Sequence, residues 1–123
     1  MQSATPTRRL VRQLTTAADL DGFLVANRHR FDTSTVQDLK EEVDRLVKTD
    51  LRQAEPLAHA TRRLARVLQD PVGIGFGDAA VAQVHHYAGR LTEAEPLYVS
   101  AIDRLRDSGR PTDAAALERQ LVG

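Results

Sequence analysis

The chain has 123 residues, enough for one domain with a buried core but too few for a catalytic domain plus a separate binding domain. Its 17 basic and 17 acidic side chains cancel, so no long-range field attracts nucleic acid or anionic lipid, and neither is an expected partner. The absence of cysteine excludes disulfides, thiolate metal sites and a cysteine nucleophile, and it fits a reducing cytoplasm, where we expect the protein.

The first 32 residues are predicted to form two short helices. Apolar side chains at helical spacing mark the first helix near residues 10–14 and the second near residues 20–31. Thr16, with Asp19 three residues later, is expected to cap the second helix. The early arginines are not followed by an uninterrupted apolar stretch, so we expect no signal peptide and no transmembrane span.

A third helix is predicted from the three-four spacing of apolar residues after position 34. Ser34 followed by Gln37 is a capping-box pattern at its start. One face is apolar, and the other is predicted to carry two ion pairs at four-residue spacing, Glu41 with Arg45 and Asp44 with Lys48.

Four more helices follow, predicted at Leu51–Gln69, Val72–Ala88, Thr92–Asp107 and from Pro111 to the chain end. Pro71, Gly89 and Gly109 separate them, because proline and glycine punctuate helices. Connections of only a few residues favour antiparallel neighbours, so helical hairpins are expected.

A sequence repeat underlies the fourth and sixth helices. The run LRQAEPL at residues 51–57 recurs as LTEAEPL at residues 91–97, forty residues later. A Thr92 cap with Glu95 would place Pro96 at the edge of the first helical turn. In the first copy, a cap at Asp50 would leave Pro56 inside the helix, so that helix either begins nearer residue 52 or bends at the proline.

The second copy, residues 87–101, resembles the centre of a tetratricopeptide repeat (TPR). The turn glycine of that family is matched by Gly89, its large residue by Leu91, its small alanines by Ala94 and Ala101, and its aromatic residue by Tyr98. The Ala-Glu-Pro-Leu sequence and the forty-residue period are similar to the longer-spaced repeats of kinesin light chains and many bacterial regulators. The resemblance implies an all-α fold in which antiparallel hairpins stack as a short right-handed solenoid of about seven helices. It implies that these five residues pack the repeats together with Ala54, Leu57 and Leu97.

The resemblance also divides the chain into two regions. Residues 1–32 would be N-terminal capping helices, and residues 33–123 would be TPR-like repeats. Within the second region, a degenerate repeat is expected at about 34–70, the best repeat at about 72–108, and an orphan or capping helix at 111–122. More loosely, residues 31–123 resemble the N-terminal repeat region of bacterial proteins that end in a CHAT peptidase domain.

In function, the resemblance implies a non-catalytic adaptor or scaffold of bacterial origin that binds a protein or peptide and needs no cofactor. The alternative is the N-terminal recognition or regulatory segment of a larger signalling enzyme such as a CHAT-type peptidase. Exposed apolar ends of the stack could also drive self-association. Carried over by position, the family's partner groove would be lined by Phe76, Ala79, Gln83, His86 and Tyr87, with core packing as the alternative for each.

No catalytic or metal-binding constellation is predicted. The adjacent His85 and His86 would point about 100° apart on a helix, so they cannot easily ligate one metal. Glu55 and His59 share a helix face, but no third ligand accompanies them.

Two other patterns have ordinary structural interpretations. The glycines of residues 73–77 lack the strand or the Lys-Ser/Thr of a phosphate loop, and instead predict close helix approach at Gly73 and Gly77. The arginines at positions 62, 63 and 66 are expected to form a solvated face.

Overall fold

The computed structural model describes residues 4–122, and side chains from residue 8 onward. The predicted regions 1–32 and 33–123 therefore include residues 1–3 and 123, which lie outside the described part. The described residues form seven α-helices and one 3-10 helix without a strand, which confirms the all-helical prediction. The elements are α1 (Ala4–Thr16), α2 (Leu20–Asn27), η1 (Arg28–Arg30), α3 (Thr33–Leu46), α4 (Leu51–Leu68), α5 (Pro71–Tyr87), α6 (Leu91–Asp107) and α7 (Pro111–Val122).

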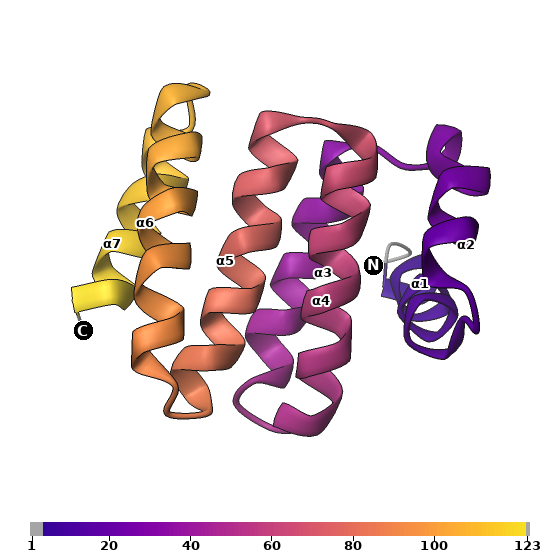
Figure 1. The fold of residues 1–123 in the computed structure, drawn as a ribbon, viewed down its shortest axis with the longest axis horizontal. Coiled ribbons are helices and arrows are strands. Elements are labelled where there is room, and N and C mark those ends of the chain that lie inside the picture. Colours follow the sequence, from indigo (N-terminus) through magenta and orange to yellow (C-terminus); the bar gives the residue numbers. More distant parts are fainter. Residues whose placement is uncertain (1–3, 123) are drawn as a thin grey trace.

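Helix α5 occupies the centre of the molecule. Consecutive helices from α3 to α7 run antiparallel, and α5 packs against α3, α4 and α6 (Figure 1). Helix α7 packs on α6 at one end, whereas α1 and α2 contact α4 at the other end (Figure 1). In the described residues, no helix is both long and apolar enough to cross a membrane.

Two glycines let α5 approach its neighbours closely. A Cβ atom added at Gly77 would lie 2.9 Å from the Cα of Arg62 on α4, so the predicted close approach at this residue is confirmed. A Cβ at Gly73 would make only ordinary contacts, the nearest at 3.4 Å to Asp70, so the prediction for this residue is wrong. Gly75 faces α6 instead, where a Cβ would lie 2.9 Å from the Cγ of Leu105.

Aspartates, rather than the predicted hydroxyl residues, cap the four helices α2 to α5. Asp19 caps α2 by accepting the backbone N–H of Gly22, and Asp32 caps α3 by accepting that of Thr35. The predicted caps at Thr16 and at Ser34 with Gln37 are therefore wrong. The hydroxyl of Thr16 instead donates to a carbonyl of its own helix, which is the usual competition between a local hydrogen bond and a cap. Asp50 and Asp70 cap α4 and α5 in the same way.

The two repeat copies begin their helices at equivalent residues. Helix α4 begins at Leu51 and α6 at Leu91, so both prolines are the sixth residue of a helix. The residue before α6, Arg90, makes no side-chain cap, and the predicted Thr92–Glu95 capping box is wrong. A proline here removes one hydrogen bond, to the carbonyl four residues earlier. Those carbonyls belong to exposed residues, Arg52 and Thr92, where water can hydrate them.

Most of the predicted repeat-packing residues lie in the core. Ala54, Leu57, Ala94, Tyr98 and Ala101 are buried, and Leu97 packs against the core while partly exposed. Gly89 adopts a positive φ of 81° in the turn between α5 and α6, which glycine tolerates best. Leu91 is the exception, because 60% of it is exposed, and its predicted packing role is wrong.

The predicted ion pairs of α3 are replaced by two others. Lys40 pairs with Asp44 at 2.8 Å, and Arg45 pairs with Glu42. The expected pairs of Glu41 with Arg45 and of Asp44 with Lys48 do not form. Asp44 also accepts a hydrogen bond from Gln83 on α5, so its carboxylate is directed toward the neighbouring helix rather than along its own.

Candidate partner surface

Gln83, a predicted groove residue, is instead the centre of a buried polar chain. Its amide nitrogen donates to Asp44 on α3 at 2.8 Å, and its amide oxygen accepts the Tyr98 hydroxyl of α6 at 2.9 Å. Only 4% of Gln83 is exposed. These two hydrogen bonds therefore satisfy buried polar groups and join three helices, so Gln83 is not available to a partner.

Burial of the Tyr98 phenol keeps its proton in place. Burial is the main cause that raises the pKa of Tyr98 to about 12, and the nearby groups of Asp44 and Tyr87 add to it. The hydroxyl therefore remains a donor to Gln83 throughout the physiological range.

Two more predicted groove residues are buried, so the predicted groove is wrong at three of its five positions. Ala79 is fully buried, and Phe76 lies under the guanidinium of Arg110 at 5.3 Å from its ring centroid. That guanidinium also donates to Gln37 on α3. The physical reason is the central place of α5, which is enclosed by α3, α4 and α6 along most of its length.

The remaining two groove residues, His86 and Tyr87, reach the surface at the end of α5. Tyr87 is 45% exposed, and His86 is partly buried. The His86 ring is tilted against Tyr87 at 5.7 Å between centroids and meets Tyr98 edge-on at 6.2 Å. These contacts fix the imidazole at the boundary between core and solvent.

His86 opens onto a hollow of about 300 Å³ that we call the C-terminal pocket. It lies between the end of α5, the start of α6 and the end of α7. Its rim is strongly apolar, because Leu91 and Val122 are 60% and 87% exposed. The lining residues are His86, Leu91, Ala94, Glu95, Tyr98, Leu121 and Val122.

The charge at this pocket is negative. Glu95 lines it and Glu93 is exposed one residue from the pocket wall, and neither has a cationic side chain within 4.0 Å in the part of the chain that the structure describes. The Thr92 hydroxyl donates a hydrogen bond to the Glu93 carboxylate, and this bond contributes most to lowering the pKa of Glu93. A hydrogen bond from the backbone of Glu93 itself lowers it further, so this carboxylate is ionised at neutral pH. The lining of the pocket thus combines exposed apolar side chains with the carboxylate of Glu95.

Beside the pocket, a polar cluster anchors the α5–α6 turn to α4. Arg90 donates to Glu55 at 3.0 Å and to the Nδ1 of His85 at 2.8 Å. Burial, followed by the charge of Arg90, lowers the pKa of His85. Glu55 and His59 share a face, as predicted, with 4.0 Å between carboxylate and imidazole. The two adjacent histidines do not converge, since His86 contacts Tyr98 instead.

None of these side chains forms a metal-binding group. Among the described residues, no set of three histidine, aspartate or glutamate side chains is arranged to hold a metal ion.

Two of the three arginines predicted to form a solvated face, Arg62 and Arg63, have partners on other helices. Arg62 donates at 2.9 Å to the buried carboxylate of Asp78 on α5, which also accepts Ser100 of α6 at 3.4 Å. Arg63 lies 3.5 Å from Asp21 of α2. The prediction of a solvated face is therefore wrong for Arg62, which is paired with a buried carboxylate that links α4, α5 and α6.

Sequence reasoning missed most of the pocket lining. Leu91 and Ala94 were interpreted as packing residues only, and Glu95 as part of a cap. The run of acidic and apolar residues at 91–95 could have indicated a surface, because Leu91 precedes two glutamates within four residues. Leu121 and Val122 gave no such signal, since their position depends on how α7 folds back over α6.

Comparisons of the chain with protein-family models, with curated proteins and with solved structures found no match.

Proposed function

We propose that this protein is a non-catalytic interaction module of the TPR type, an adaptor or scaffold that binds a peptide segment of another protein. The C-terminal pocket carries the proposal, because it exposes large apolar side chains beside the carboxylate of Glu95 at the end of a helical hairpin. The antiparallel order of α3 to α6 and the equivalent starts of α4 and α6 support a repeat origin. A right-handed solenoid is part of this proposal.

The chemistry of the pocket selects the partner. A volume of about 300 Å³ accommodates one or two side chains rather than a folded domain. Leu91, Leu121 and Val122 favour an apolar anchor. Glu95 favours a lysine or arginine next to that anchor, because opposite charges raise the association rate and set the register. The proposed ligand is therefore a peptide in which an apolar residue adjoins a basic one.

A peptide-display selection against the whole chain tests this. Selected sequences should be enriched in an apolar residue next to lysine or arginine, and their affinities can be measured by fluorescence anisotropy. Leu91→Ala should weaken binding by about tenfold, since the leucine side chain that the peptide would cover contributes about 1–2 kcal/mol. Glu95→Gln should weaken it most at low salt.

Val25→Ala is the matched control. Val25 is similarly exposed, at 56%, but lies on α2 at the opposite end of the molecule. Both substitutions remove surface apolar atoms, so neither should change stability by more than about 0.5 kcal/mol. Peptides that bind Leu91→Ala as tightly as the unchanged chain, or that lose affinity equally with Val25→Ala, would remove the pocket from the proposal.

A further inference from the structure

A second pocket, of about 480 Å³, lies between α1, α3 and α4 and shares no lining residue with the C-terminal pocket. We call it the arginine pocket. Four arginines and one glutamate line it, which gives a local formal charge of 4 − 1 = +3 in a chain whose total is zero. The lining residues are Arg8, Val11, Arg12, Thr15, Thr16, Glu42, Arg45, Arg52, Gln53 and Pro56.

The single carboxylate of the pocket is already neutralised. Both carboxylate oxygens of Glu42 accept hydrogen bonds from the guanidinium of Arg45, one of them at 3.2 Å. Arg8, Arg12 and Arg52 have no carboxylate within 4.0 Å among the described residues. Three guanidinium groups that have no carboxylate partner in the described part of the chain therefore border one hollow.

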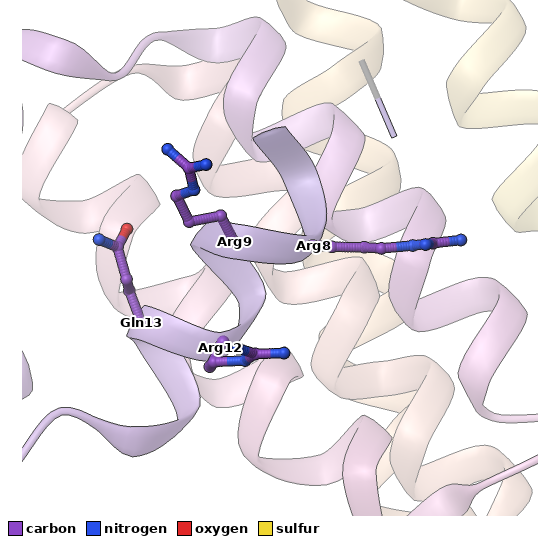
Figure 2. Close-up of a pocket in the computed structure, with 4 residues that line it drawn as sticks. All are labelled: Arg8, Arg9, Arg12 and Gln13. Carbon is purple, nitrogen blue, oxygen red and sulfur yellow. The ribbon is translucent and has the colours of Figure 1, made fainter. Parts of the chain in front are cut away.

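Two of the lining arginines, Arg8 and Arg12, come from the same side of α1. Arg8 and Arg12 are one helical turn apart and project to the same side of α1, whereas Arg9 and Gln13 project to the other (Figure 2). The same four residues line a smaller hollow of about 250 Å³ on this helix (Figure 2). Arg52, in the first turn of α4, lines the same pocket as Arg8 and Arg12.

The geometry points to a phosphate monoester as the ligand, and we propose that the arginine pocket binds this group. A phosphate dianion carries up to two charges and three acceptor oxygens, which suit three guanidinium groups as hydrogen-bond donors. A single carboxylate would leave two of those guanidinium groups without an acceptor. The hydroxyls of Thr15 and Thr16 donate to backbone carbonyls of α1, so the arginines supply the free donors.

The rest of the lining narrows the ligand further. No aromatic side chain lines the pocket, so nothing there would stack on a nucleotide base. Val11 and Pro56 offer small apolar contacts that suit a short carbon stem such as that of phosphoserine. The phosphate could belong to a free small molecule or to a phosphorylated side chain of a protein, and the chemistry of recognition is the same.

A titration of the isotopically labelled chain with O-phosphoserine, followed by amide NMR at about 20 mM salt, tests the proposal. Shifts should concentrate on α1 and on the α3–α4 turn. The double variant Arg12→Gln/Arg52→Gln should weaken binding by at least about tenfold, because it removes two of the three guanidinium groups that would donate charge-assisted hydrogen bonds to the phosphate. The control Arg66→Gln/Arg104→Gln removes the same charge from exposed sites and should change affinity by less than about twofold.

Two further arms identify the source of the phosphate and can overturn the proposal. A phosphoserine peptide that binds more tightly than O-phosphoserine assigns the site to a protein ligand, and equal affinity assigns it to a small molecule. Either result requires that free serine and the same peptide without its phosphate do not bind. The proposal fails if no amide shifts, if both double variants lose affinity equally, or if only anionic lipid vesicles bind.

Discussion

Replacing Gly77 with alanine should reveal how tightly α5 is packed against α4. The added Cβ would lie 2.9 Å from the Cα of Arg62, 3.3 Å from the Cβ of Ala65 and 3.5 Å from the Cβ of Arg62. Ordinary contacts between carbon atoms are about 3.5–4.0 Å, so the two helices must separate by about 0.5–1 Å. The obstructing atom belongs to the backbone of α4 and cannot rotate away.

Two effects of opposite sign decide the outcome. Alanine is favoured over glycine in a helix interior by about 1 kcal/mol. Overpacking a well-filled core costs about 1–3 kcal/mol, and the rigid neighbour at Gly77 places the cost near about 3 kcal/mol. The net loss of unfolding free energy should be about 2 kcal/mol, which lowers the Tm by roughly 6–12 °C for a chain of this length.

Urea and thermal denaturation of Gly77→Ala and Gly73→Ala measure this difference. At Gly73 a Cβ meets nothing closer than 3.4 Å, so the helix preference should prevail and stability should stay equal or rise by up to about 1 kcal/mol. If Gly77→Ala proved as stable as Gly73→Ala, the packing argument for the α4–α5 contact would be wrong.

Two pH-dependent predictions follow from the buried polar groups. The pKa of Tyr98, raised to about 12, means that the folded state holds this proton more tightly, so the associated stability is complete below about pH 10 and is lost between about pH 10 and 12. Ultraviolet titration of the folded chain should show an absorbance step near pH 12 that Tyr98→Phe removes, and a step near pH 10 instead would contradict it. The lowered pKa of His85 has the opposite effect, so the stability it contributes is complete above about pH 6.5 and is lost below that value, as the pH falls through the lower pKa of the folded state. Urea midpoints between about pH 5 and 8 should depend less on pH in His85→Gln than in the unchanged chain, and identical profiles would show that His85 does not titrate as inferred.

The helices could be predicted from the sequence because their signals are local. Pro71, Gly89, Gly109 and Pro111 separate helices within one or two residues of the predicted limits. The caps were less predictable, because several residues before each helix can accept a backbone N–H. At α3, both Asp32 and Ser34 are suitable, and only the folded geometry decides between them.

The ion pairs of α3 show a second limit of local reasoning. The spacing of Asp44 and Lys48 suits a pair along one helix. In the folded chain Asp44 accepts the amide of Gln83, thirty-nine residues away, and pairs with Lys40 instead. A contact at that separation has no signature in the spacing of α3, because its geometry depends on how α5 packs against it.

The predicted groove is wrong where α5 is enclosed, and free surface for a ligand lies instead where α5 is not covered by its neighbours. A periodic pattern identifies the apolar face of a helix that has one free side. Helix α5 has no free side over most of its length, so Phe76, Ala79 and Gln83 fill the core whatever their position in a repeat. Free surface arises where α5 ends at Tyr87, and where α1 crosses α3 and α4. The two pockets lie at these places, one acidic and apolar and the other basic, so a single partner with a basic-apolar segment and a phosphorylated residue could engage both. Binding to both would make each variant, Leu91→Ala and Arg12→Gln/Arg52→Gln, lower the affinity of such a partner separately, with the two losses adding because the sites share no residue.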